Sequence, residues 1–250
     1  GSYNNFIGNY AGNFCTTGQL NNAIGYQTLH NLTSGTGNIA SGYQAGYYTY
    51  ASTYNVMIGH EAGQGDTASG EPAAHKNVFI GWQAAKGRRT TDWNVVVGAT
   101  AARTLQSGDQ NVALGARALY TNSGGHRNIA IGYEALYTYA GSDNVAIGRE
   151  ALKNATAGPN TAVGYSCGTT LTTGEYNVLM GYLTGYAHTT GTGNVGLGAQ
   201  ALRNITTGSD NVSIGYNAGF TGTGATGNTF LGFHSGYSTT HGNNTFIGKN

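Results

Sequence analysis

Hydrophobic and polar positions recur along this chain with a period of about 17 residues. An asparagine precedes a glycine by four residues fifteen times, at Asn4, Asn21, Asn38, Asn55, Asn77, Asn94, Asn111, Asn128, Asn144, Asn160, Asn177, Asn194, Asn211, Asn228 and Asn244. The intervals are 17 residues in ten cases, 16 in three and 22 in one. A fixed short period predicts stacked units that contact mainly their neighbours. We number the positions of each unit from its asparagine.

Positions one to five of each unit predict a short β-strand. They read Asn, a β-branched residue, a variable residue, an aliphatic residue and Gly, and turn-forming residues bound them. Positions ten to seventeen are rich in Thr, Ser, Gly and Asn, which is typical of a return turn. The frequent glycines leave no stretch long enough for a stable helix. We therefore expect an all-β solenoid of about 15 rungs of 16–17 residues.

The predicted strand is apolar on both faces. Position four is aliphatic in nearly every unit and is expected to face the interior of the coil, with Ser41 as a locally loose exception. Position three lies on the opposite face, because side chains alternate along a strand, yet it is usually apolar or small. Such a strand needs cover on both sides, so the sequence predicts that a partner chain covers position three.

Three further positions constrain the coil. Gly at position five indicates a positive φ or a close backbone approach, and Asn at position one favours left-handed backbone and could link rungs through its amide. Position eight is small, which predicts a narrow coil. Position nine is Leu, Ala or Gly, and an aromatic residue often follows the Gly, which suggests volume exchange between these two neighbours. The structural repeat residues are clearest at Asn111, Gly115, Asn128, Gly132, Asn144 and Gly148.

The 22-residue interval contains an insertion, which is expected to form a surface loop over residues 64–76. Insertions in solenoids often project from a binding face. The following unit contains both tryptophans and the densest charge in the chain. The alternatives are a solvated loop and a glycan or receptor contact, for which the candidates are Asp66, Glu71, His75, Trp82, Lys86, Arg88, Arg89, Asp92 and Trp93.

Several features resemble catalytic sites, but their context favours a structural role. Residues 164–168 match the G-x-S-x-G motif and residues 222–227 match G-x-G-x-x-G, yet neither lies beside a predicted helix. Glu134 and Glu150 occupy position seven of adjacent units, where one rung of about 5 Å would suit a retaining glycosidase. Position seven is polar in most units, so a solvated stripe is the favoured interpretation, and we expect no enzyme activity.

Composition narrows the partners. Charged residues make up 8% of the chain, with 11 Lys and Arg against 10 Asp and Glu, so no net field would attract nucleic acid or an anionic membrane. No apolar run is long enough for a membrane helix. The seven His and two Cys have no metal-ligand spacing, so no cofactor or metal is expected, and Cys167 is interpreted as a packed small side chain.

The unit Asn-Val-Ala-Ile-Gly-x-Glu-Ala-Leu, clearest at 144–152, resembles repeats of phage tail-fibre-like proteins and bacterial surface proteins, and its core is similar to the head repeat of YadA-like trimeric autotransporter adhesins. The resemblance implies a parallel, left-handed β-roll, a homotrimer about a common axis and attachment to a surface. We expect residues 1–250 to be one solenoid segment of a longer extracellular fibre, on a virion or a bacterial cell.

These observations leave several functions open. The first is a phage tail-fibre segment that holds or presents binding to a cell-surface glycan or another host receptor, and the second is a bacterial trimeric adhesin or extracellular filament. The third is a polysaccharide depolymerase that uses Glu134 and Glu150. The fourth is an ice-binding protein, which would require a regular column of threonines, whereas the threonines are interpreted here as scattered among turn positions.

Overall fold

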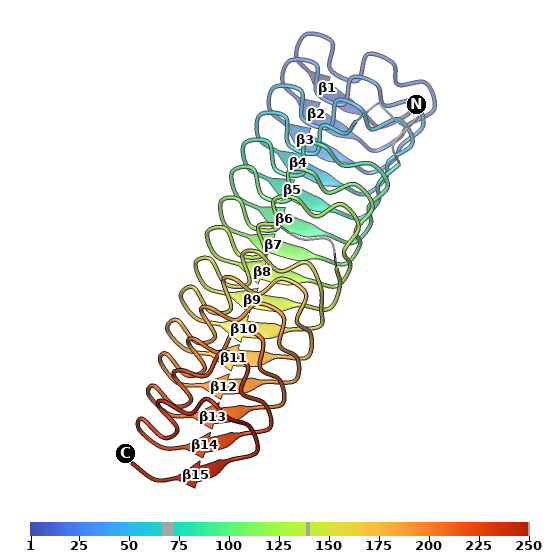
Figure 1. The fold of residues 1–250 in the computed structure, drawn as a ribbon. Coiled ribbons are helices and arrows are strands. Elements are labelled where there is room, and N and C mark those ends of the chain that lie inside the picture. The colour runs from blue at the N-terminus through green and yellow to red at the C-terminus, as the bar shows by residue number, and fades with distance from the viewer. Residues whose placement is uncertain (67–72, 139–140, 250) are drawn as a thin grey trace. The chain divides into compact units, whose positions relative to one another are not determined.

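The structure is a computed structural model that describes residues 1–66, 73–138 and 141–249. The chain forms two compact units, Gly1–Arg127 and Asn128–Asn250, which we call unit 1 and unit 2 and treat separately. The described residues form fifteen strands and no helix (Figure 1). The all-β prediction is therefore confirmed. Residues 67–72 of the predicted insertion, Glu71 among them, lie outside the described residues.

Each unit is a parallel β-solenoid in which every strand pairs with the next one along the chain (Figure 1). The strands occupy positions two to four, which is narrower than the predicted one to five. Unit 1 contains β1 (Asn5–Ile7), β2 (Asn22–Ile24), β3 (Ile39–Ser41), β4 (Val56–Ile58), β5 (Val78–Ile80), β6 (Val95–Val97) and β7 (Val112–Leu114). Unit 2 contains β8 (Ile129–Ile131), β9 (Val145–Ile147), β10 (Thr161–Val163), β11 (Val178–Met180), β12 (Val195–Leu197), β13 (Val212–Ile214), β14 (Thr229–Leu231) and β15 (Thr245–Ile247).

The two faces of the strands are opposite to those predicted. The middle residue of the strand, position three, is buried in the coil, as with Phe79, Ala113 and Phe230. Positions two and four point outward, and Ile24 is 42% exposed. The expectation that position four fills the interior is wrong. Ser41 accordingly lies on the outer face and does not loosen the core.

The interior is filled by exchange of volume between positions three and nine. A Cβ on Gly12 would lie 2.4 Å from the ring of Phe6, and one on Gly236 would lie 2.3 Å from the ring of Phe230. In most turns where position three is Ala, as at Ala113, position nine is a buried Leu such as Leu119, whereas at Gly46 the space is taken by Leu29 and Met57 of the neighbouring turns. Close packing requires this compensation. The predicted exchange with the aromatic residue at position ten is wrong, because those rings lie outside the core.

The glycine at position five meets both conditions that the sequence suggested. Gly98 has φ of +143°, and a Cβ there would lie 2.5 Å from the carbonyl oxygen of Gly115 in the next turn. The asparagine at position one is not left-handed, so that expectation is wrong. The residue before it is, as at Trp93, and so are residues at positions seven and nine, such as Gln83 and Ala85. Left-handed backbone at these non-glycine positions costs about 1 kcal/mol each, which bonding between turns must offset.

A ladder of buried asparagine amides links successive turns, as the sequence suggested. In unit 1 the backbone N and the Nδ2 of Asn38 both donate to Oδ1 of Asn21, at 2.9 and 3.0 Å. Nδ2 of Asn38 also donates to the carbonyl oxygen of Ser52 at 2.8 Å. The pattern continues through unit 2, where Asn194 and Asn211 make the same contacts. Each amide thus satisfies its own turn and both neighbouring turns.

Small and aromatic side chains complete the turn that follows each strand. Position eight is buried in nearly every turn and includes Cys167, whose thiol donates to the Leu179 carbonyl oxygen at 3.2 Å. Burial raises the pKa of Cys167 to about 12, which fits the predicted packing role. Aromatic rings at position six stack from turn to turn, for example Tyr26 on Tyr43 at 5.4 Å between centroids. The predicted aromatic ladder is confirmed.

One buried titratable group lies in the core of unit 2. His188 at position twelve is 1% exposed, and its Nδ1 and Nε2 lie 2.8 and 3.0 Å from the carbonyl oxygens of Ile205 and Gly191. Nδ2 of Asn194 lies 3.2 Å from Nε2, so a neutral ring can donate from Nδ1 and accept at Nε2. Burial lowers the pKa of His188, and its bonds to the two carbonyls oppose that shift.

The amide ladder gives the first prediction. Asn211→Ala removes the side chain that accepts from Asn228 N and Nδ2 at 3.0 Å and that donates to the Ala225 carbonyl oxygen at 2.8 Å. Buried groups left without partners should destabilise unit 2 by about 3 kcal/mol. The control is Asn154→Ala, because Asn154 lies outside the ladder. Urea unfolding measures the stability of both variants. Small shifts of equal size in the two unfolding midpoints would contradict a special role of the ladder.

The buried histidine gives a pH-dependent prediction. Because the pKa of His188 is lowered from its usual 6.5 in the folded chain, the unfolded chain takes up the proton first, and stability is lost as the pH falls below 6.5. His188→Asn replaces the ring with a non-titrating amide that can donate to the Gly191 carbonyl, as Asn122 does to that of Gly125 in unit 1 at 2.9 Å. The variant should lose part of the acid sensitivity of the unfolding midpoint, whereas His241→Asn on the surface should not. Identical pH profiles for wild type and His188→Asn would refute the assignment.

Candidate functional site

The predicted glycan-contact residues do not form one site. Asp66 is paired with Arg89, whose Nη2 lies 3.1 Å from Oδ2 of Asp66. Lys86 donates to Oε2 of Glu61 at 2.8 Å. Burial raises the pKa of Glu61, but hydrogen bonds from Lys86 and Gln83 outweigh it, so the pKa is lowered overall. These charges are therefore neutralised locally.

Arg88 is fully buried, so the prediction that it contacts a receptor at the surface is wrong. Its Nε donates to the carbonyl oxygen of Gly63 at 3.0 Å, and its guanidinium lies 5.9 Å from the ring centroid of Phe79. Among the described residues Nη1 and Nη2 have no hydrogen-bond partner. Burial lowers the pKa of Arg88 to about 10. This side chain fills the core at position twelve, where most turns have an aliphatic residue or a small polar one.

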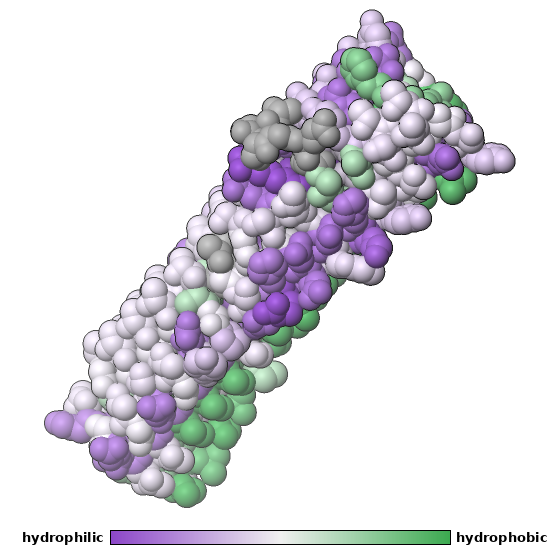
Figure 2. Space-filling view, turned by 90° about the vertical axis from the view of Figure 1, so that its right-hand side faces the viewer, coloured by the Kyte–Doolittle hydropathy of each residue, from purple (hydrophilic) through white to green (hydrophobic). Residues whose placement is uncertain are grey.

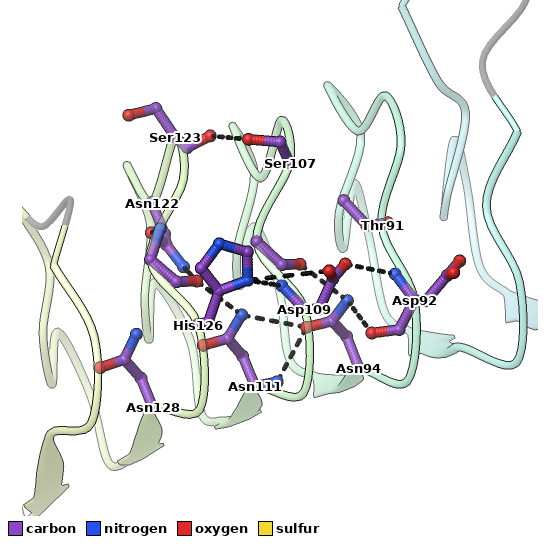
Figure 3. A network of polar contacts seen from close by, with 12 residues as sticks. Thr91, Asp92, Asn94, Ser107, Asp109, Asn111, Asn122, Ser123, His126 and Asn128 are labelled. Carbon is purple, nitrogen blue, oxygen red and sulfur yellow. Dashed lines mark hydrogen bonds and ion pairs between the residues drawn. The ribbon is translucent and has the colours of Figure 1, made fainter.

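His75 and Asp92 belong to a second side-chain ladder, at position sixteen. Figure 3 shows the part of this ladder formed by Asp92, Asp109 and His126. Oδ1 of Asp92 accepts from the backbone N of His75 at 2.7 Å, and Oδ1 of Asp109 accepts from the backbone N of Asp92 at 2.8 Å. Nδ1 of His126 then accepts from the backbone N of Asp109 at 3.1 Å. Each side chain satisfies the backbone of the preceding turn, so this column stabilises the stack of turns in unit 1.

The two tryptophans lie at opposite edges of the strand face. Trp93 is two residues before β6, is 56% exposed and has Nζ of Lys76 4.2 Å from its ring centroid. Trp82 is two residues after β5 and is 53% exposed. Trp82 belongs to the position-six aromatic column and faces a groove formed by positions six, seven and ten. Of the predicted residues that the structure describes, Trp82 alone lines the hollow in this groove.

The groove contains a hollow in unit 1, beside Trp82. There position six is Ala99 and then Ala116, so two rings are missing from the aromatic column and a hollow of about 360 Å³ remains. Its lining residues are Trp82, Gln83, Ala99, Thr100, Arg103, Ala116, Arg117 and Tyr120, none of which is acidic. Nη1 of Arg103 donates to the hydroxyl of Tyr120 at 3.1 Å. Sequence reasoning missed this hollow, although two alanines in an otherwise aromatic column were its visible signal.

A second hollow of about 420 Å³, lined by residues that include Tyr237, Phe246, Ile247 and Lys249, lies at the last described turn. Phe246 is 45% exposed there, whereas the equivalent Phe230 one turn earlier is buried. The hollow is therefore the uncovered end of the coil rather than a site built from converging polar groups.

The paired carboxylates of unit 2 are engaged in ion pairs and hydrogen bonds. Glu134 is 7% exposed and accepts from Nζ of Lys153 at 2.7 Å. Glu150 accepts from the hydroxyl of Ser166 at 3.2 Å and lies 3.5 Å from Nη2 of Arg149. Ser166, the central residue of the G-x-S-x-G match, is thus a donor in the position-seven column. These contacts confirm position seven as a polar column, but the interpretation of it as solvated is wrong, because Glu134 and Ser166 are buried.

The interpretation of the threonines as scattered is wrong. In unit 2 position thirteen is Thr in successive turns, at Thr156, Thr172, Thr189, Thr206 and Thr223. Each of the first four hydroxyls donates to the carbonyl oxygen of the next threonine, at 3.0 to 3.1 Å. The column is regular when each turn is counted from its asparagine.

The outer face of the strands is an uncovered apolar surface. Positions two and four are Ile, Val, Leu or Met in most turns, and none of these residues is charged. In unit 2, Ile147 is 36% exposed, Ile214 37% and Met180 43%. Figure 2 shows hydrophobic side chains gathered in a band toward the C-terminal end of this unit. Exposed apolar surface of this kind is uncommon on monomeric proteins, which makes this face a candidate interaction surface.

No protein-family model, curated protein sequence or solved structure matches this chain. No helix within the described residues has the length and hydropathy needed to cross a bilayer. The same residues contain no group of three or more His, Cys, Asp or Glu arranged to bind a metal ion.

Proposed function

We propose that this chain is a structural segment of a surface-attachment fibre, assembled as a homotrimer and presenting glycan-binding residues on its turns. A phage tail fibre is the favoured setting, with a bacterial trimeric adhesin or extracellular filament as the alternative. The observation that carries the proposal is the uncharged apolar face at positions two and four. The resemblance of the repeat to tail-fibre and YadA-like sequences supports the same assignment.

The proposed partner for this face is a second copy of the same chain. The face repeats its pattern once per turn, so a surface with the same repeat can place side chains against it in every turn. A second copy necessarily has the same repeat. The chain carries a formal net charge of only +1, so electrostatic repulsion between copies is small. Three copies around one axis would each bury this face and leave the return turns outside.

Charged substitutions on the outer face test the assembly. The wild-type chain should have a mass in solution near three times 25.8 kDa by light scattering. Ile147→Lys with Ile214→Lys should give folded monomers, because six buried ammonium groups per trimer would be desolvated. Thr173→Lys with Thr207→Lys, on the return turns, should remain trimeric. A wild-type monomer would overturn the fibre proposal.

The threonine column of unit 2 supports ice binding as a second candidate. Regularly spaced hydroxyl and methyl groups, as at Thr172, Thr189 and Thr206, are the feature that this function requires. Against it, each hydroxyl is already a donor within the column.

Thermal hysteresis decides this second candidate. An ice-binding chain should depress the freezing point below the melting point, and Thr190→Lys with Thr207→Lys beside the column should abolish the gap. Wild-type protein without hysteresis would remove ice binding, and the expected outcome under the fibre proposal is no hysteresis.

A further inference from the structure

The hollow beside Trp82 is a gap of defined size in a stacked aromatic column. In unit 1 the rings of position six stack at 5.4 Å between Tyr26 and Tyr43 and at 4.8 Å between Tyr43 and His60. Trp82 continues the column in the next turn, and then Ala99 and Ala116 leave two successive turns without a ring. The two turns without a ring span about 10 Å along the coil, which leaves enough space for a six-membered ring to pack against Trp82.

The walls of this hollow have the chemistry of a sugar site. Trp82 is an exposed, flat apolar surface of the kind on which a pyranose ring packs. Gln83 and Thr100 add polar side chains to the lining, and Nε2 of Gln83 is held by its hydrogen bond to Oε2 of Glu61 at 2.7 Å. Ala99 and Ala116 keep the space open. The hollow therefore combines one stacking surface with converging hydrogen-bonding groups, the usual composition of a small-ligand site.

The charge of the hollow selects among sugars. Arg103 and Arg117 both line it, and no acidic side chain does. The guanidinium of Arg103 is held at the rim by its hydrogen bond to Tyr120, which fixes its position while leaving its other donors for a ligand. A planar guanidinium binds a carboxylate through two parallel hydrogen bonds. The nearest position-seven carboxylate in the sequence before the hollow, Glu61, is already paired with Lys86.

We propose that this hollow binds a carboxylate-bearing sugar of a surface glycan, with its ring packed on Trp82 and its carboxylate paired with Arg103. The inference rests on the glycan-binding part of the proposed function, and it names the site and the class of sugar. It does not depend on the oligomeric state, because every lining residue belongs to unit 1 of one chain.

Unit 2 contains a matched internal comparison. There Ala199 interrupts the position-six column for one turn only, between Tyr182 and Tyr216. The equivalent arginine at position ten, Arg203, lies 5.9 Å from the ring centroid of Tyr186 and 5.6 Å from that of Phe220. It is thus packed between two aromatic rings. This place lacks both the longer gap and the wall of two arginines, so it should not bind the same ligand.

The test uses the full chain with Trp93→Phe, so that Trp82 is its single tryptophan. The probes are soluble uronic-acid and sialylated oligosaccharides, each paired with its carboxyl-reduced counterpart. Titration should change Trp82 emission with the acidic probes, and reduction of the carboxyl should weaken binding at least about tenfold, the loss expected for a bidentate charged contact. Arg103→Gln should weaken it similarly, whereas Arg203→Gln should leave it unchanged.

A filling variant separates binding from folding. Ala99→Tyr supplies one of the missing rings, a residue that the column already accepts at Tyr26 and Tyr43, and should abolish binding while the unfolding midpoint and the mass in solution stay unchanged. Equal binding of acidic and reduced probes, or none by any acidic probe, would overturn the proposal. Binding that persists in Ala99→Tyr and Arg103→Gln would place the ligand elsewhere. A wild-type monomer that still binds would refute the fibre assignment and leave this site standing.

Discussion

The buried asparagine amide is the constraint on which the rest of each unit depends. Its oxygen accepts two donors from the next turn while its nitrogen donates to a carbonyl across the coil, as at Asn38 and Asn194. A buried peptide group without a partner is costly, so these bonds fix both the spacing and the register of neighbouring turns. Short strands of three residues would not do so alone. The turn before each asparagine tolerates left-handed residues because this ladder holds the chain on either side.

Once the register is fixed, the side chain required at each other position depends only on its own turn and the neighbouring turns. In most turns the interior receives one large side chain from position three or position nine, and the residues of the outer turns vary more freely than those of the core. Structural and functional roles therefore separate by position: the core needs matched volumes, the outer sheet face needs apolar side chains, and the turn after the strand is free to bind. The hollow at Ala99 and Ala116 uses that freedom, since omitting two rings there leaves the core contacts in place.

The periodicity alone predicted the solenoid, the role of Gly at position five and the links between asparagines. It did not assign the faces of the strand, because positions three and four are both apolar, and alternation does not say which one points inward. The missing signal was present in pairs such as Phe6 with Gly12 and Ala113 with Leu119, where large and small residues alternate between positions three and nine. Arg88 could not be placed from sequence, because a charged residue beside an insertion is ordinarily solvated, whereas here its long side chain fills the core of the coil.

The direction of the hydrogen bonds has a mechanical consequence. In each unit the bonds between turns run along the stacking direction, so tension applied through the chain ends would load the contacts of one terminal turn rather than many turns at once. Turns would then peel away singly, and each released turn of 17 residues adds about 55 Å of extended chain. Such a unit would yield in steps and lengthen under load rather than lose all of its turns at once.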